Sequence, residues 1–366
     1  MNLLKLLQRV TYTGNKILYI DGLRFFAVVS VFIAHFFDYY SDNYPAFDEK
    51  FNISKYKYTS GVGVLLFFAI SGFIISLPFI KQYVYNEKKV SIKNYFIRRL
   101  TRLEPPYILL LILFFLLQVF VFHSKSFSEL FPHFLASLFY SHNLIYHEMP
   151  VINPVLWTLE IEVQFYIIAP LILLIFKTNK LIRRTILLLV IFGWSSFNFI
   201  PNLGFKNLLD YLPYFLLGIF CADIYLDNKI EIKKHIIFDI ICFAAIIIIF
   251  INPNQNIFFL TIIALLTLSN KSKYFIKLLE RKLLYIIGGL CYSIYMLHQK
   301  LIYLLNAFYP PNKIFFNNYY LDFGIKFIIT AIVVLVSSSI FFILVERPTM
   351  KKNWWKYKDY KKLFFE

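Results

Sequence analysis

Residues 17–37 read ILYIDGLRFFAVVSVFIAHFF, an almost unbroken apolar run. A helix needs about 20 apolar residues to cross the hydrocarbon core of a bilayer, so this run has spanning length. Residues 1–16 place three basic side chains ahead of it, as a signal peptide would, but the run is long and lacks a small-residue cleavage site. The stretch therefore predicts a retained first membrane span.

The composition extends this interpretation to the whole chain. Hydrophobic residues make up 59% of the 366 and charged residues 16%, whereas soluble domains average about 45–50% and about 25%. A protein in water must cover its apolar residues with polar ones, and this chain has too few polar residues to do so. In lipid the outer surface can stay apolar. The three cysteines all lie in hydrophobic stretches, so neither a disulfide framework nor a metal-ligand spacing is indicated.

Ten stretches have the apolar character of membrane helices. They lie at 17–37, 60–80, 105–122, 157–176, 185–200, 208–226, 236–251, 256–269, 283–305 and 323–345. We expect an all-α integral membrane protein, a bundle of about ten transmembrane helices. Residues 1–345 are expected to form one transmembrane domain, and residues 346–366 a basic cytoplasmic tail.

Lys and Arg are distributed unevenly over the segments between the spans. When these segments are assigned alternately to two sides, beginning with the N-terminus, one side holds 29 of them and the other holds 6. Basic loops stay in the cytoplasm, so both termini are expected there, in a multi-pass protein of the inner (cytoplasmic) membrane. The net charge of +17 is spread over six loops rather than one face, which argues against nucleic acid as a partner.

Residues 129–146 are apolar enough to suggest another span. If they crossed the bilayer, every later basic loop would face outward, against the charge distribution. Their apolar residues recur at i, i+4 and i+8, which indicates an amphipathic helix. We expect an interfacial or re-entrant helix on the outer face.

Ionisable groups inside spans are energetically costly and often functional. In the first span, Arg24 and His35 are eleven residues apart, which places them about 20° apart around the helix axis and about 16 Å apart along it. A cation near the inner surface and a titratable base deeper in the membrane form a stripe that suits an extended, phosphate-bearing cofactor. Alternatively, Asp21 pairs with Arg24 at i+3 and His35 only caps the outer end of the helix.

A second cluster, with the sequence RRLTRLEPPY, covers residues 98–107. Arg99 and Arg102 are neighbours on one helix face, a geometry suited to gripping a phosphate or pyrophosphate. The structural alternative is an ordinary basic flank on the cytoplasmic side.

The start of the fourth span carries polar side chains that are costly in lipid. Glu162 and Tyr166 share a face at i+4, and Glu160 shares a face with Gln164, whereas the two carboxylates are about 200° apart. One carboxylate could orient the imidazole of His35, or each could bond a neighbouring helix.

The ninth span contains Ser293 and His298, whose spacing does not suit a Ser–His relay within one helix. His298 is either a functional group or a packing histidine. Four more histidines lie within residues 123–147, but without a diagnostic ligand spacing, so no metal is expected.

Six motifs in chain order resemble the membrane acyltransferase-3 family. They are DGLR (21–24) with His35, LFFAISGF (66–73), RRLTR (98–102), LWTLEIEVQFY (156–166), YSIYMLH (292–298) and ERP (346–348). The resemblance implies transfer of an acyl group, usually acetyl, from cytoplasmic acyl-CoA to a hydroxyl of a surface glycan or lipid-linked sugar. It also implies that the Arg24–His35 and Arg99–Arg102 pairs are functional. Some relatives carry an additional hydrolase-like domain; the chain ends about 20 residues after its last span, so none is expected.

Together these features lead to one hypothesis, with acyl-CoA, a glycan or lipid-linked glycan acceptor and membrane lipids as partners. Arg99 and Arg102, with Arg24, would hold the phosphates of acyl-CoA, and the pantetheine arm would run along the stripe of the first span. His35 would act as the general base on the acceptor hydroxyl.

Glu162 or Glu160 would orient His35, and Ser71 or Tyr166 would donate to the tetrahedral oxyanion. Two alternatives stay open: a proton-coupled transporter of an anionic or sugar-like solute, and a non-catalytic membrane scaffold.

Overall fold

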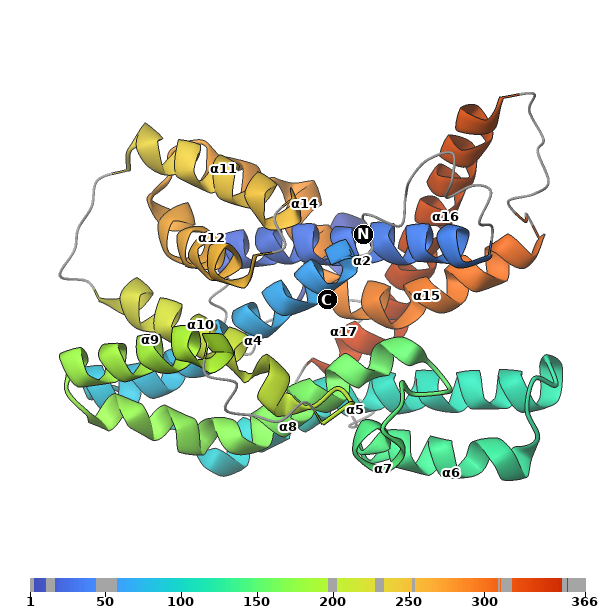
Figure 1. Ribbon diagram of the computed structural model, residues 1–366, viewed down its shortest axis with the longest axis horizontal. Coiled ribbons are helices and arrows are strands. Elements are labelled where there is room, and N and C mark those ends of the chain that lie inside the picture. Colours follow the sequence, from blue (N-terminus) through green and yellow to red (C-terminus); the bar gives the residue numbers. More distant parts are fainter. Residues whose placement is uncertain are drawn as a thin grey trace. The chain divides into compact units, whose positions relative to one another are not determined.

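The structure is a computed structural model, and it describes residues 3–10, 17–43, 58–196, 203–227, 234–251, 254–308, 310, 318–350 and 354. Every regular element in these ranges is a helix, as Figure 1 shows, which confirms the predicted all-α class.

Six helical stretches are long and apolar enough to cross a membrane. They are Leu18–Asn43, Gly61–Tyr85, Ile92–Val121, Pro154–Lys177, Leu208–Leu226 and Tyr320–Thr349. The other four predicted spans also overlap helices, but three of these are short: α9 (Lys180–Ser196), α11 (Ile236–Ile251) and α12 (Gln255–Leu268). The fourth is divided into α14 (Lys282–Gly289) and α15 (Cys291–Phe308). The count of ten and the side of the termini stay predictions.

The segment predicted as an interfacial or re-entrant helix forms two short helices, α6 (Phe127–Leu138) and α7 (His142–Tyr146). Ser126 and Glu129 form a capping box at the start of α6. Tyr140, between the helices, adopts a left-handed conformation with φ 53°, which ends the helical path. Neither helix reaches the length that a membrane crossing requires.

The chain divides into two compact units. The first contains residues 1–64 and 282–366, and the second contains residues 65–281. This division does not test the predicted boundary at residue 345 between a transmembrane domain and a tail, which stays a prediction.

In the first unit, helices from the two ends of the chain pack together. The long helix α2 (Leu18–Asn43) contacts α14 and α15, and α15 contacts α16 (Tyr319–Phe341), as the blue and orange-red ribbons of Figure 1 show. Gly288 on α14 makes the approach to α2 possible, because a Cβ there would lie 1.7 Å from the backbone oxygen of Asp21. The unit also contains the short elements α1 (Leu3–Leu6), η6 (Phe342–Glu346) and α17 (Arg347–Thr349).

In the second unit, α10 (Leu208–Leu226) contacts α9, α12 and α8 (Trp157–Ile172). Helix α5 (Ile92–Leu116) contacts α6, and α7 contacts α8, as the teal and green ribbons of Figure 1 show. The remaining elements are α4 (Tyr58–Tyr85, whose first residues belong to the first unit), η2 (Leu117–Val121), η3 (Pro154–Leu156), η4 (Leu173–Lys177), η5 (Ser269–Lys271) and α13 (Phe275–Leu279).

An ion-pair network joins two of these helices. Asp223 on α10 accepts hydrogen bonds from Arg183 at 2.7 Å and from Arg184 at 2.6 Å, both at the start of α9. Asp223 is buried, so the two guanidinium groups satisfy a carboxylate that would otherwise be costly.

Candidate active site

Arg24 forms an ion pair in the first unit. Asp21 pairs with Arg24 at i+3, and the same carboxylate oxygen lies 3.2 Å from Nη1 of Arg9. Asp21 and Arg24 are both buried. The ion pair that the sequence analysis gave as the structural alternative for Asp21 and Arg24 is therefore formed. The three side chains together carry one net positive charge.

His35 lies on the same helix as Arg24, α2, eleven residues further along the chain. Its Nδ1 is 3.7 Å from Oδ2 of Asp38, one turn later. Its ring also lies beside that of His298 on α15, with the ring centroids 5.1 Å apart and the planes inclined by 40°. The structure therefore brings together two candidate histidines that are 263 positions apart in the sequence.

The ninth predicted span places its two polar candidates in different surroundings. Ser293 donates a hydrogen bond to the buried carboxylate of Glu346 in η6. His298 is held through Nδ1 by its own helix, 2.8 Å from the backbone oxygen of Tyr295 and 3.1 Å from that of Ile294. The two residues thus have separate partners among the described side chains and backbone atoms.

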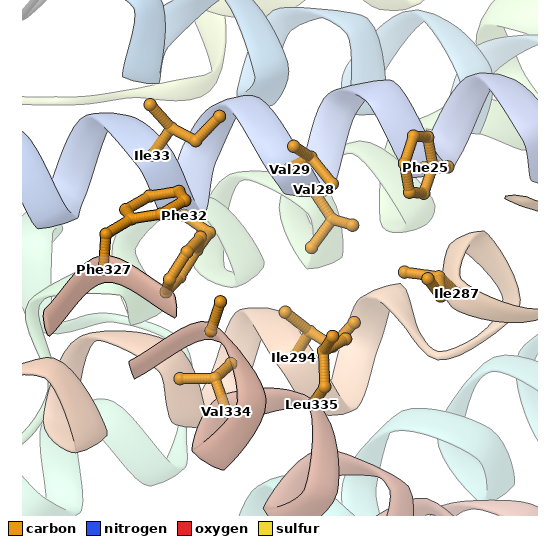
Figure 2. Close-up of a pocket in the computed structure, with 11 residues that line it drawn as sticks. Phe25, Val28, Val29, Phe32, Ile33, Ile287, Ile294, Phe327, Val334 and Leu335 are labelled. Carbon is orange, nitrogen blue, oxygen red and sulfur yellow. The ribbon is translucent and has the colours of Figure 1, made fainter. Parts of the chain in front are cut away.

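An apolar cavity of about 200 Å³ lies beside α2, between the levels of Arg24 and His35. Figure 2 shows side chains of α2, α14, α15 and α16 turned toward it, among them Phe32, Ile294 and Leu335. All eleven lining residues are apolar. The α2 residues that line it are centred about 100° around the helix from the Arg24–His35 stripe. A pantetheine arm carries amide groups that need partners, so this cavity suits hydrocarbon better.

In the second unit, three predicted candidates meet around one carboxylate. Ser71 on α4 donates to Oε1 of Glu162 at 3.0 Å, and the hydroxyl of Tyr166 donates to the same oxygen. The bond between Glu162 and Tyr166 confirms the predicted common face on α8. Both hydroxyls face an acceptor, so in this arrangement neither is free to donate elsewhere.

The Arg99 side chain lies beside this cluster. Its guanidinium carbon is 5.4 Å from the ring centre of Tyr95 and 5.5 Å from that of Tyr166. The Tyr95 hydroxyl donates to the backbone oxygen of Tyr166 at 3.0 Å, which ties α5 to α8. These aromatic rings hold the charge of Arg99 in place without neutralising it.

Arg99 and Arg102 share one feature. The Nε–H group of each is buried and has no hydrogen-bond partner among the described residues. Neither side chain forms an ion pair with a carboxylate in that part of the chain. A buried donor without an acceptor costs about 1–3 kcal/mol, so this pair is suited to receive an anion.

Glu160 is engaged elsewhere. Its carboxylate accepts hydrogen bonds from the backbone N–H of Asn143 at 3.0 Å, from the Asn143 amide at 3.2 Å and from the backbone N–H of Leu144 at 3.3 Å. These are donors at the start of α7, where an acidic side chain is favourable. Glu160 thus anchors α7 to α8.

Two of the additional histidines form a pair in the α6–α7 segment. Nδ1 of His133 lies 2.9 Å from Nε2 of His142, whose Nδ1 lies 3.3 Å from the backbone oxygen of Glu148. Burial lowers the pKa of both imidazoles. No group of three or more His, Cys, Asp or Glu side chains in the described ranges is placed to hold a metal ion.

Sequence reasoning did not single out Asp38 or Tyr95 as site residues. Asp38 follows His35 at i+3, and Tyr95 precedes Arg99 at i+4. Helical spacing alone therefore carried a signal for both.

Comparison with known proteins identifies relatives. The chain is 28% identical over 375 residues to the O-acetyltransferase OatA of Staphylococcus aureus (strain NCTC 8325 / PS 47), covering 91% of this chain and 57% of the relative. It is 27% identical over 349 residues to the putative O-acetyltransferase SACOL0978 of S. aureus (strain COL), covering 84% and 54%. The chain thus spans somewhat more than half the length of these relatives.

No solved structure matches the chain. The family model described as an acyltransferase domain (Acyl_transf_3) matches residues 17–346, which include five of the six motifs in full and the first residue of the sixth. The chain therefore belongs to the acyltransferase-3 family.

Proposed function

We propose that the chain is a membrane O-acetyltransferase that moves an acetyl group from acyl-CoA to a hydroxyl of a cell-surface polysaccharide or lipid-linked sugar. The observation that carries the proposal is the acyltransferase match over residues 17–346. Relatives whose names state O-acetyltransferase activity, at 27–28% identity, support acetyl as the group and oxygen as the acceptor atom.

The phosphates of acyl-CoA would bind Arg99 and Arg102. Support comes from their two buried, unpartnered Nε–H groups and from the absence of a neutralising carboxylate among their described contacts. Arginine binds phosphate oxygens through charge-assisted hydrogen bonds. Arg24 is a weaker candidate for the phosphates in this proposal, because it already forms an ion pair with Asp21.

His35 would be the general base. Its neutral imidazole takes the proton of the acceptor hydroxyl as the oxygen attacks the thioester carbonyl. Collapse of the tetrahedral intermediate forms the ester and breaks the carbon–sulfur bond, and the proton passes from His35 to the departing CoA sulfur. The sequence analysis gave the orienting role to Glu162 or Glu160; the 3.7 Å between Nδ1 of His35 and Oδ2 of Asp38 supports Asp38 as a further candidate for it.

Ser71 and Tyr166 stay the candidates for stabilising the oxyanion. Each hydroxyl would have to turn from Glu162 to do so. Replacing either hydroxyl would then lower the rate with little effect on acyl-CoA affinity.

The proposed protein spans the inner membrane about ten times with both termini in the cytoplasm. The charge distribution supports this arrangement, as do the helices that overlap all ten predicted spans. A protease site added after residue 366 should be cleaved in inverted vesicles and protected in intact cells stripped of their outer layers. The reverse pattern would overturn the orientation.

Radiolabelled acetyl-CoA, supplied to the purified protein with cell-envelope glycans, tests the function. We expect label in the glycan with wild type and loss of transfer in His35→Ala at equal expression. Acetyl-CoA should bind Arg102→Ala about 10-fold more weakly or worse, since a charge-assisted bond contributes about 1.5–3 kcal/mol. Arg98→Ala, an exposed neighbour, is the matched control. Wild type that binds no CoA, or accumulates a solute in vesicles without acetyl transfer, would refute the enzyme.

A further inference from the structure

An aromatic cluster lies where α8 and α10 begin, in the second unit. The rings of Trp157 and Tyr211 have their centroids 5.1 Å apart, with the planes inclined by 43°. Both rings contact Phe68 on α4, at 6.5 Å and 5.4 Å between centroids. Phe68 is buried, whereas Trp157 and Tyr211 each keep part of their surface exposed. The cluster therefore presents two aromatic rings at the surface of the unit.

A lysine lies against these two rings. Nζ of Lys206 is 5.7 Å from the ring centre of Trp157 and 5.9 Å from that of Tyr211, within cation–π distance. Lys206 is the only Lys or Arg in residues 201–207, a segment on the side that the charge distribution leaves poor in basic residues. The positive-inside rule therefore does not account for it. We refer to Trp157, Tyr211 and Lys206 together as the aromatic platform.

The polar ends of the platform side chains have no partners in the described part of the chain. The indole N–H of Trp157, the hydroxyl of Tyr211 and the ammonium of Lys206 form no hydrogen bond or ion pair with a described residue. Trp194 on α9 differs in this respect, because its indole N–H donates to the backbone oxygen of Leu209 at 3.0 Å. The platform thus combines ring faces with three donors that are available to a ligand.

This combination matches the chemistry of a sugar ring. A pyranose whose hydroxyls are mostly equatorial presents C–H groups on its faces, and these pack against the partly negative face of an aromatic ring. Its hydroxyl and ring oxygens accept hydrogen bonds from indole, phenol and ammonium donors. Anchoring at a membrane interface, the other common role of Trp and Tyr, depends on depth alone and would be shared by Trp194, which also reaches the start of α10.

The platform also lies near the Glu162 cluster. Ser71, which donates to Glu162, follows Phe68 by three residues, about 4.5 Å along the axis of α4. Trp157 precedes Glu162 by five residues, about 7.5 Å along the axis of α8. A sugar on the platform would therefore be a neighbour of Ser71 and Tyr166, the proposed oxyanion donors.

We propose that the aromatic platform is a binding subsite for one pyranose ring of the acceptor glycan, held by stacking on Trp157 and Tyr211 and by hydrogen bonds from Lys206. The inference rests on the proposed function for the identity of the acceptor and adds the residues that bind it. The platform has no role in holding acyl-CoA, so its loss should weaken the affinity for glycan alone.

Three substitutions isolate the ring of Trp157. Trp157→Leu keeps apolar bulk beside Phe68 and removes both the aromatic face and the N–H group. Trp157→Phe restores an aromatic face. Trp194→Leu is the matched control, because Trp194 is also partly exposed but its N–H group is already bonded within the protein.

Direct binding is measured without acetyl-CoA, as retention of tritium-labelled fragments of cell-envelope glycan by the immobilised protein. We expect Trp157→Leu to weaken retention about 3- to 10-fold, the effect of losing an aromatic stacking partner, and Trp157→Phe to change it by less than about 2-fold. Trp194→Leu should match wild type. In radiolabelled acetyl transfer, Trp157→Leu should raise KM for glycan by the same factor and keep KM for acetyl-CoA within about 2-fold.

The outcomes separate the subsite from the proposed function. Wild type that retains no glycan fragments would overturn the inference, as would equal retention by Trp157→Leu or an equal loss in Trp194→Leu. If Trp157→Leu melts below wild type in detergent, Lys206→Met replaces it, since this side chain is exposed and the change removes only the ammonium; unchanged retention then overturns the inference equally. Wild type that retains glycan but transfers no acetyl group refutes the proposed function and leaves the subsite standing.

Discussion

Gly288→Ala should separate α14 from α2 next to the Asp21–Arg24 pair. A Cβ at Gly288 would lie 1.7 Å from the backbone oxygen of Asp21, 2.8 Å from its carbonyl carbon and 2.9 Å from the backbone nitrogen of Phe25. Ordinary contact begins near 3.4 Å. These obstacles are backbone atoms, which cannot rotate away, so the helices have to move apart.

The expected cost follows from that overlap. Overpacking a tight contact destabilises proteins by about 1–3 kcal/mol, and occasionally by more. The higher helix propensity of Ala returns up to about 1 kcal/mol. Because the overlap is with backbone, we expect Gly288→Ala to lose at least about 1 kcal/mol net. A shift of about 1 Å at a site can lower a rate about 100-fold, so acetyl transfer should fall by about 10- to 100-fold.

The adjacent glycine is the matched control. Among the described residues, a Cβ at Gly289 would meet only Arg9, at 3.6 Å from its Cβ, which is ordinary van der Waals contact. Gly289→Ala makes the same chemical change one position away and should melt at or above the wild-type temperature. The assays are thermal unfolding in detergent and radiolabelled acetyl transfer. Equal melting and equal activity of the two variants would refute the proposed contact between α14 and α2.

Three further perturbations test other parts of the molecule. Asp223→Asn leaves two guanidinium groups without their carboxylate and should lower the free energy of unfolding by about 3–5 kcal/mol, as thermal unfolding would measure. Asp227→Asn is the control, because its partners are more exposed, and it should lower that free energy by about 1 kcal/mol or less. Glu160→Gln turns an amide toward N–H donors of α7 and should speed hydrogen exchange at 142–147, an effect that Glu162→Gln should not reproduce. Burial lowers the pKa of His142, so the stability of the α6–α7 segment should be fully present above about pH 6.5 and should fall as the pH drops below it. Equal protection factors at about pH 7.5 and about pH 5.5, after correction for the pH dependence of intrinsic exchange, would contradict this.

The helical elements were predictable because their signals are local. Apolar length predicted ten spans, each of which overlaps a described helix. The spacing of Glu162 and Tyr166 predicted their common face, which the hydrogen bond confirms. The break at Leu290 was not predicted, since an apolar run gives no sign of where a helix is divided. Nor was the left-handed residue Tyr140, which divides 129–146 into two helices.

Contacts between helices that are distant in the chain could not be predicted from the sequence. Glu162 accepts a hydrogen bond from Ser71, 91 positions earlier, and the ring of His35 lies beside that of His298. Each contact depends on how helices are rotated against one another, which no single periodicity specifies. Local spacing did predict the pairing of Asp21 with Arg24, because both lie on one helix.

The candidate polar side chains differ in their partners. Arg24 and Glu160 were both candidates in the sequence analysis. In the structure Arg24 pairs with Asp21, and Glu160 accepts hydrogen bonds from backbone donors within its own unit. Arg99, Arg102 and His298 each keep one buried polar atom without a described partner. Buried polar atoms of this kind also occur outside the motifs, so an orphaned atom alone is a weak signal. Combined with a family motif it becomes a prediction: ligand or transition state should satisfy these three atoms, and substitutions there should reduce binding or turnover more than they reduce stability.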